Sequence, residues 1–336
     1  MQEQNNWSVR NPNFGRLPQP GATPIKPPLQ SVFVIVPCFN EGPVIRQTIA
    51  ELLPLGVTVV VVDDGSRLPV RQPGEPLPFH LVRHSINLGQ GAALQTGMDY
   101  ALRQGAELLI HFDADGQHDP STIPPMVEIL RSQSTDVVFG SRFLLPARKR
   151  LLLRVSTFIS RLFCGLWLSD TRSGLRGLTR QAAQQIRLTE NGSGHASEIL
   201  SEIRRARLRY LEIPTLVRST DYSRGKGQSI GNSLNLAFDP APQKTKFQLL
   251  LIASIVSGAL IASATLAAKL GNRFAQPQPN NDSIGRGADL LLYLSIIVGT
   301  YALLLNFQRT RRLEQRLTQH VRAAALQSAI PPEHFS

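Results

Sequence analysis

A largely apolar segment of this 336-residue chain, Leu108–Phe112, ends in two carboxylates, Asp113 and Asp115. Carboxylates in a loop at the end of a strand are poor material for a core, because burying a charge is costly. Their oxygens are the ligands that hard divalent cations such as Mg²⁺ prefer, and such a cation can also hold phosphates. The spacing therefore predicts a site for a divalent cation and a phosphate-containing ligand.

The same plan occurs upstream, where the β-branched run Val59–Val62 ends in Asp63 and Asp64, followed by Gly65. Two strands that both end in paired acids, within one alternating pattern of strands and helices, point to a nucleotide-sugar site. A second interpretation of Asp63 is that its carboxylate only caps the end of the strand.

The elements that must position these acids alternate between strand and helix. Short β-branched runs predict strands, and apolar residues at helical spacing predict helices. The expected strands are 31–37, 57–62, 79–83, 107–112 and 136–139, and the expected helices are 41–53, 89–103 and 121–130. Near-continuous apolar strands indicate an α/β fold with a mostly parallel sheet covered by helices on both faces. Such sheets bind ligands at the carboxyl ends of their strands, where both acid clusters lie.

Composition divides the chain into four parts. Residues 1–30 are rich in Pro, Asn and Gln and predict a disordered lead-in, residues 31–240 carry the α/β pattern, residues 247–307 hold two apolar segments, and residues 308–336 form a basic tail. The net charge is +12. Because the Arg residues flank apolar segments without interleaved aromatics, this charge favours an anionic membrane surface over nucleic acid.

Two segments are long enough to cross a bilayer. Phe247–Ala268 contains no charged residue, and Leu290–Phe307 is polar at only a few positions. The alternative is that both are buried helices of a soluble domain. The arginines after Phe307 predict a cytoplasmic tail, so the pair predicts a transmembrane hairpin in the cytoplasmic membrane, with the α/β domain facing the cytoplasm. Leu151–Trp167 predicts an amphipathic helix, either in the membrane interface or packed on the sheet.

Six sequence blocks carry a family resemblance. They are Val36–Glu41, Val62–Ser66, Asn87–Ala93, Asp113–His118, Gly140–Arg142 and Asp170–Arg176. Their residues and order resemble the family 2 glycosyltransferases of GT-A fold, and in particular the dolichol-phosphate mannosyltransferases and bacterial polyprenyl-phosphate glycosyltransferases. Gln90 departs from the family, whose members usually have Lys or Arg there, and this puts the identity of the donor in doubt.

The resemblance implies a role for each matching position. A nucleotide-sugar donor would bind at Pro37, Glu41, Asp63, Asp64 and Asp113. A metal ion, Mg²⁺ or Mn²⁺, would be held by Asp113, Asp115 and Gln117. The catalytic candidates are Arg142, Asp170 and Glu198. The phosphate of a polyprenyl acceptor would meet Arg224 and Lys226, in a loop with two glycines, and further positive charge near it would come from Arg172, Arg176 and Arg218.

Three functions compete on this basis. The first is an inverting transfer of a sugar from a nucleotide donor to a polyprenyl phosphate. The second extends a lipid-linked or surface glycan at a sugar hydroxyl, which needs a general base. The third is a catalytically silent membrane scaffold, against which the intact pair of aspartates argues. The sequence indicates neither the sugar nor an oligomeric state.

Overall fold

The computed structural model describes residues 29–71, 77–142, 165–171, 173–192, 194–218 and 282–333. Among these, residues 29–218 and 320–333 belong to one compact unit, and residues 282–319 belong to a second. The first unit contains the sheet and the acidic residues predicted to form the site.

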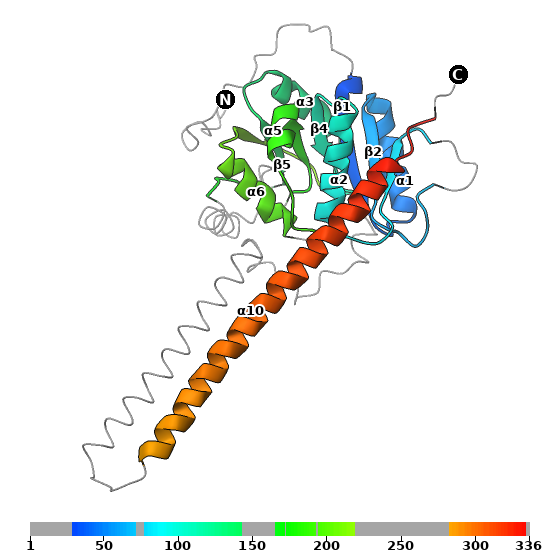
Figure 1. Ribbon diagram of the computed structural model, residues 1–336. Coiled ribbons are helices and arrows are strands. Elements are labelled where there is room, and N and C mark those ends of the chain that lie inside the picture. The colour runs from blue at the N-terminus through cyan, green and yellow to red at the C-terminus, as the bar shows by residue number, and fades with distance from the viewer. Residues whose placement is uncertain are drawn as a thin grey trace, which may run out of the picture. The chain divides into compact units, whose positions relative to one another are not determined.

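The described part of the first unit is built on a seven-stranded sheet in the order β3-β2-β1-β4-β6-β5-β7 (Figure 1). The strands are β1 Val32–Cys38, β2 Thr58–Asp63, β3 His80–Arg83, β4 Leu108–His111, β5 Val137–Ser141, β6 Arg176–Thr179 and β7 Tyr210–Pro214. All neighbouring pairs are parallel except those of β6, which runs antiparallel to both β4 and β5. The sheet is therefore mostly parallel, as the sequence predicts.

Helices and short 3₁₀ turns connect these strands. The helices of this unit are α1 Pro43–Leu52, α2 Gln90–Arg103, α3 Ile123–Arg131, α5 Arg180–Gln185 and α6 His195–Arg205, and the turns are η1 Leu29–Ser31, η2 Leu53–Leu55 and η3 Pro120–Thr122. A further helix, α10 Asp282–Gln327, begins in the second unit and ends in the first.

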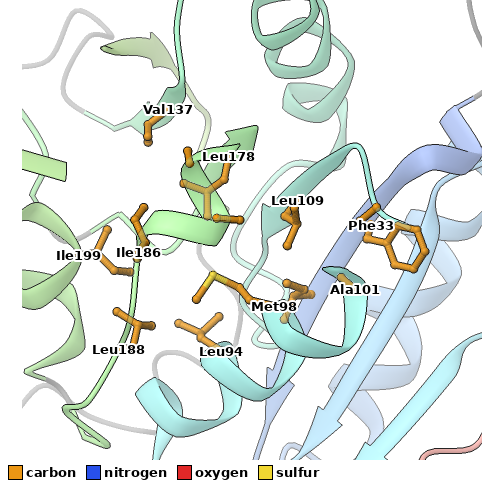
Figure 2. Packing of buried hydrophobic residues seen from close by; sticks show 14 of the residues in the cluster. Phe33, Leu94, Met98, Ala101, Leu109, Val137, Leu178, Ile186, Leu188 and Ile199 are labelled. Carbon is orange, nitrogen blue, oxygen red and sulfur yellow. The ribbon is translucent and has the colours of Figure 1, made fainter. Parts of the chain in front are cut away.

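Each face of the sheet has its own apolar core, because successive residues of a strand point to opposite faces. Phe33 and Ile35 of β1 pack in one cluster with α2, α5 and α6, whereas Val34 and Val36 pack in the other with α1 and α3. Figure 2 shows the first cluster, where Met98 of α2 lies among neighbours from other elements. Strands buried on both faces explain the uninterrupted valine runs.

The five predicted strands and three predicted helices of residues 31–142 are confirmed, with ends shifted by one or two residues. Strands β6 and β7 were not predicted. β6 reads Arg-Gly-Leu-Thr and lacks a β-branched run, and β7 contains Glu212 and ends at Pro214, so neither shows the apolar pattern of a central strand.

Only one of the two predicted membrane segments lies within the described residues. Phe247–Ala268 lies outside the described residues. Leu290–Phe307 is helical as predicted, as part of α10. Within the described portion of the chain, no helix is both long enough and apolar enough to cross a membrane.

The amphipathic helix predicted for Leu151–Trp167 lies almost wholly outside the described residues. Its last three positions, from Gly165 to Trp167, are described and are not helical. Leu166 and the following Leu168 are buried in the first apolar cluster, so this stretch packs on the sheet.

Candidate functional site

Both acid clusters lie at one edge of the sheet, because parallel neighbours end on the same side. β2 ends at Asp63, and β4 ends at His111, two residues before Asp113. β1 pairs with both strands, with Cys38 opposite Asp63 and Ile35 opposite His111. This edge is where the sequence places the site.

Asp113 is held by side chains from two other segments. Gln90 Nε2, at the first residue of α2, donates to Asp113 Oδ1 over 3.0 Å. His118 Nε2 lies 3.2 Å from Asp113 Oδ2. Gly174 packs so closely on the carboxylate that a Cβ there would overlap it. The Asp113 side chain is therefore fixed before any ligand binds.

Asp113 and Asp115 have opposite pKa shifts. Burial raises the pKa of Asp115, and the negative charges of Asp113 and Glu41 add to this, although the Gln117 N–H that donates to Asp115 Oδ1 over 3.0 Å opposes it. Burial also raises the pKa of Asp113, but its hydrogen bond to His118 and nearby positive charges outweigh burial and lower it overall. A cation bound here would relieve the repulsion that raises the pKa of Asp115.

The donor set at this loop fits a hard divalent cation. Within the described ranges, no three His, Cys, Asp or Glu side chains cluster as metal ligands. Two carboxylates and the amide oxygen of Gln117 are nevertheless oxygen donors of the type that Mg²⁺ and Mn²⁺ accept, and Mg²⁺ is commonly held by one or two carboxylates plus substrate phosphates. Asp113, Asp115 and Gln117 thus remain the predicted metal ligands.

Val217 and Arg218, which follow β7, contact the loop that carries Asp115 and Gln117. Arg218 N donates to Gln117 O over 2.8 Å, and Val217 forms an isolated bridge with His118. The Arg218 guanidinium contacts Glu51 at 2.9 Å and Asp119 at 3.2 Å. Its charge is thus directed at two carboxylates of this chain, which disfavours the predicted role at an acceptor phosphate.

Asp64 organises the loop that leads into α2. Its carboxylate accepts hydrogen bonds from Leu88 N at 2.9 Å and from Gly89 N at 2.7 Å. The same carboxylate lies 2.7 Å from His84 Nδ1, and the His84 ring is fully buried. These contacts hold the loop before α2 in place, and the predicted role of Asp64 in binding the base and ribose of a donor stays a prediction.

Asp63 makes the capping contact of the second interpretation given above. Its Oδ1 accepts from Ser66 N at 2.9 Å, which closes the turn after β2. Its Oδ2 lies 3.4 Å from Arg83 Nε and is buried without a hydrogen-bond partner among the described residues. That oxygen keeps a donor-binding role open for Asp63.

Arg142 and Asp170 bind each other. Arg142 Nε donates to Asp170 Oδ2 over 2.7 Å, and Nη2 donates to Oδ1 over 2.9 Å. The hydrogen bond with Asp170, followed by the attraction of its charge, raises the pKa of Arg142. The Asp170 side chain is 2% exposed, whereas that of Arg142 is 39% exposed. The pair therefore presents its cationic side to solvent.

Glu212 of β7 binds the segment that carries Asp170. Its carboxylate accepts from Ser169 N at 2.9 Å, from Ser169 Oγ at 2.9 Å and from Asp170 N at 3.1 Å. Burial raises the pKa of Glu212, although these hydrogen bonds oppose the effect. Sequence reasoning missed Glu212, because the signal for it, a lone acid within an apolar strand, emerges only when β7 is recognised.

Glu198, the third catalytic candidate, is engaged within its own segment. It accepts from Thr189 N at 2.9 Å, from Thr189 Oγ1 at 2.5 Å and from Glu190 N at 2.8 Å. Glu198 lies in the first turn of α6, where a negative charge is favourable. These contacts describe a residue that ties a loop to a helix, and its catalytic role stays untested.

The remaining predicted residues divide by location. Pro37 is buried in β1 opposite Val62, and Glu41 lies near enough to Asp115 to raise its pKa. Arg224 and Lys226 lie outside the described residues. Burial, followed by nearby acids, raises the pKa of the Cys38 thiol well above its usual value, so Cys38 is a poor nucleophile.

A buried basic cluster lies behind the acids, and the sequence did not predict it as a unit. Arg176 of β6 pairs in register with His111 of β4. The Arg176 residue is 2% exposed, and two of its side-chain nitrogens have no hydrogen-bond partner among the residues that the structure describes. Burial lowers the pKa of Arg176 to about 10 and, together with the Arg176 charge, lowers that of His111 to about 3 and that of His195 to about 4. Both histidines are thus neutral at pH 7.

Known proteins are similar to this chain over much of the first unit. Residues 33–194 match the family model described as glycosyl transferase family 2. An uncharacterized protein of Methanocaldococcus jannaschii is 32% identical over 223 residues, which are 63% of this chain and 92% of that protein.

Two named relatives act on lipid phosphates. A UDP-N-acetylglucosamine–dolichyl-phosphate N-acetylglucosaminyltransferase of Methanococcus voltae is 26% identical over 59% of this chain and 90% of its own. An undecaprenyl-phosphate mannosyltransferase of Micrococcus luteus is 28% identical over 60% of this chain and 90% of its own.

Among solved structures, a Mycobacterium tuberculosis glucosyl-3-phosphoglycerate synthase in complex with Mn²⁺ and UDP-glucose overlaps with a TM-score of 0.43. It is 19% identical, over 58% of this chain and 76% of that chain, an overlap too loose to say anything of the site. The match to the family model and the extent of the sequence relatives establish the family without it. The chain is a glycosyltransferase that belongs to family 2, and it resembles the transferases that act on dolichyl and polyprenyl phosphates.

Proposed function

We propose that this glycosyltransferase moves one sugar from a nucleotide-sugar donor to a polyprenyl phosphate, with inversion and with a bound divalent cation, in the synthesis of cell-surface glycans. In this reaction the bond between the sugar C1 and the leaving diphosphate breaks, and a bond from C1 to a phosphate oxygen of the lipid forms on the opposite face. No proton has to be moved, because a phosphomonoester with a second pKa of ~6 is already anionic at neutral pH.

The contact between Arg142 and Asp170 carries this proposal. Both carboxylate oxygens of Asp170 already accept hydrogen bonds from the Arg142 guanidinium. A general base needs an oxygen that can reach and take the proton of an acceptor hydroxyl. With Asp170 committed in this way and Glu198 tied to Thr189 and Glu190, neither candidate base is poised for a sugar hydroxyl. An acceptor that arrives as an anion suits these residues better.

Asp113, Asp115 and Gln117 would hold Mg²⁺ or Mn²⁺ in this proposal, and the cation would neutralise the charge that builds on the leaving diphosphate. The protein contributes order to that site. Gln90 and His118 keep Asp113 oriented, and the backbone N–H of Arg218 holds the carbonyl of Gln117 in place. A carboxylate held in advance loses little conformational freedom when its ligands bind.

The partly exposed Arg142 is the described cation best placed to meet anionic ligands. Its guanidinium is oriented by Asp170, and its positive charge would favour a diphosphate or a lipid phosphate near the end of β5. Arg224 and Lys226 would provide the further contacts to the lipid phosphate, as the family resemblance implies.

We place the enzyme at the cytoplasmic membrane, with its catalytic domain facing the cytoplasm. Two observations support this location: the named relatives act on dolichyl phosphate and undecaprenyl phosphate, and α10 exposes large apolar side chains, among them Val298, Tyr301 and Leu303. A carbonate wash of membranes tests it, since the full-length chain should stay in the membrane fraction, and its release would contradict an integral location.

An assay of the acceptor tests the function directly. Purified full-length protein is incubated with undecaprenyl phosphate and a panel of radiolabelled UDP- and GDP-sugars, and the lipid is then extracted. We expect label in the lipid phase with one donor. Label that enters only a glycan would support extension at a sugar hydroxyl instead, and no label from any donor would support a silent scaffold.

Substitution of Arg224 and Lys226 by Gln refines that test. A charge-assisted contact to phosphate contributes roughly 1.5–3 kcal/mol. The double variant should therefore raise the KM for polyprenyl phosphate about tenfold or more while donor binding stays nearly unchanged. Arg316→Gln, in an exposed stretch of α10, is the matched control for loss of positive charge. An unchanged KM in the double variant would count against the lipid phosphate.

A further inference from the structure

The C-terminal residues of the chain are built into the transferase unit. Leu81 N donates to Ile330 O and Ile330 N donates to Leu81 O, each over 2.9 Å, so Ile330 pairs with edge strand β3. Glu333 N donates to Leu77 O over 2.9 Å, and Glu333 forms an ion pair with Arg71. We call residues 320–333 the C-terminal clasp.

The clasp also contributes to the apolar core. Val321 and Ala325, on the last turns of α10, are 8% and 2% exposed, and Ala325 belongs to the cluster formed with α2, α5 and α6. Leu326 and Ala329 pack against the same cluster. An edge strand that is covered in this way is protected from pairing with other chains, but apolar packing alone does not explain the largely buried arginine near the start of the clasp.

That arginine is Arg322, which reaches two side chains of α2. Its Nε donates to Thr96 Oγ1 over 3.1 Å, and its Nη2 donates to Asp99 Oδ2 over 2.5 Å. The Arg322 side chain is 17% exposed, so these contacts are largely shielded from water. Hydrogen bonds in such surroundings hold a charged side chain in one orientation.

From Thr96 a chain of hydrogen bonds continues into the site. The Thr96 hydroxyl donates to Ala92 O over 2.9 Å, so toward Arg322 and His84 it acts as an acceptor. His84 Nε2 lies 2.9 Å from Thr96 Oγ1, and His84 Nδ1 lies 2.7 Å from Asp64 Oδ1. Thr96 and His84 are both fully buried.

This series of hydrogen bonds ends at the loop that precedes α2. Asp64 accepts hydrogen bonds from the backbone N–H groups of Leu88 and Gly89. Gly89 has φ 107°, and a Cβ there would overlap Asn191 O, so this loop backbone requires glycine at position 89. The next residue is Gln90, which binds Asp113 of the predicted metal pair.

We infer that Arg322 is a positioning residue, which acts through Thr96, His84 and Asp64 to hold the loop 87–90 against the metal-binding acids. The inference rests on the proposed function only in taking that loop as part of the donor site. This role gives the clasp a function beyond covering β3, because Arg322, near the end of α10, makes a contact that orders the site.

Hydrogen exchange of the backbone amides tests the inference on the full-length protein without any ligand. Arg322→Gln should raise the exchange rate of the Leu88 and Gly89 amides about tenfold, because a hydrogen bond of a charged group contributes roughly 1.5–3 kcal/mol. Exchange in β4, at residues 108–111, should stay unchanged. Arg322→Lys, which keeps the charge, should restore part of the protection.

Two further variants separate the relay from simple docking of the clasp. Thr96→Val removes the central hydroxyl and leaves the Arg322–Asp99 contact, so it should expose the Leu88 and Gly89 amides while the Ile330 amide stays protected. Glu333→Gln weakens the clasp at its far end and should leave the loop protected. Unchanged loop exchange in both Arg322→Gln and Thr96→Val, or a rise that includes β4, would overturn the inference.

An activity measurement then links the relay to the donor. With the nucleotide sugar that the wild type accepts, Arg322→Gln and Thr96→Val should raise the KM for the donor more than they lower kcat. If the wild type transfers no sugar at all, the proposed function fails, whereas the exchange experiment still decides whether the relay exists.

Discussion

Arg142 donates two hydrogen bonds to Asp170, from Nε to Oδ2 over 2.7 Å and from Nη2 to Oδ1 over 2.9 Å. The two residues are 28 positions apart in the sequence. The carboxylate is almost fully buried, and its main-chain N–H is bound by Glu212. This arrangement makes Asp170 an orienting group for a cation, and it leads directly to the first prediction.

Asp170→Asn should lower kcat/KM for polyprenyl phosphate only modestly, by about tenfold or less, because Asn loses only part of a charge-assisted contact that contributes roughly 1.5–3 kcal/mol. The orienting role can be filled in part by the amide oxygen of Asn. Steady-state kinetics with both acceptor types measures this. Near-complete loss of transfer to a sugar hydroxyl, with the lipid phosphate reaction absent, would identify Asp170 as a general base instead.

Arg142→Gln should be costly for stability. It leaves the Asp170 carboxylate buried without its cation, and breaking a buried pair costs 3–5 kcal/mol, which we reduce to about 2–3 kcal/mol because the arginine is partly exposed. Urea unfolding of Arg142→Gln beside the double variant with Asp170→Asn measures the cost. The double variant should recover part of the loss, and equal stability of the two would contradict an ion pair that is important for the fold.

Asp115→Asn should abolish transfer and stabilise the fold. The raised pKa of Asp115 means that the folded chain binds its proton more tightly than the unfolded chain, so ionisation of Asp115 at pH 7 costs folding free energy that Asn avoids. The variant should therefore melt higher than the wild type in EDTA, and it should gain less from added Mg²⁺ or Mn²⁺. Thermal melts with and without metal measure both effects. Full transfer by this variant in EDTA would rule out the metal role.

Gly174→Ala should impair the site while the fold persists. A Cβ at Gly174 would overlap the Asp113 carboxylate, which would have to give up its contact with Gln90 or His118. We expect a loss of roughly tenfold to a hundredfold in kcat/KM for the donor, the cost of one contact to a charged group. Gly192→Ala, where a Cβ meets nothing within 4 Å, is the control and should retain activity. Normal donor kinetics in Gly174→Ala would show that the orientation of Asp113 is unimportant.

His111→Phe should flatten the dependence of stability on pH. Burial lowers the pKa of His111 to about 3 from its usual value of 6.5, so the unfolded chain takes up a proton that the folded chain does not bind. Stability is then complete above pH 6.5 and is lost as the pH falls toward 3, with a cost of about 2 kcal/mol at pH 5. Urea unfolding between pH 4 and 7 should show a shallower slope in His111→Phe. The exposed His320→Gln serves as control, and identical slopes in His111→Phe and the wild type would contradict the assignment.

The sequence by itself determined the half of this sheet that β3, β2, β1 and β4 form. β-branched runs at Val32–Val36 and Val59–Val62 can bury both faces only in a covered parallel sheet, and acids placed directly after such runs must reach its carboxyl edge. For the same reason, the position of Asp113 and Asp115 at the carboxyl ends of the strands could be predicted without coordinates.

What each acid does at that edge was decided by tertiary contacts. Asp64 is a predicted donor-binding residue and Glu198 a predicted catalytic residue, but backbone N–H groups from loops that folding brings near donate to their carboxylates. Gln90 departs from the family pattern, and only the approach of α2 to the end of β4 shows that its amide binds Asp113.

The antiparallel strand β6 and the C-terminal clasp show the same limit. Arg176–Thr179 forms a strand because it fills the gap between β4 and β5, whose edges supply the hydrogen bonds that its own sequence does not favour. The contact of Arg322 with Thr96 joins residues 226 positions apart. Local sequence records propensity and charge, whereas the partner of a buried polar group is set by whichever distant segment folding places beside it.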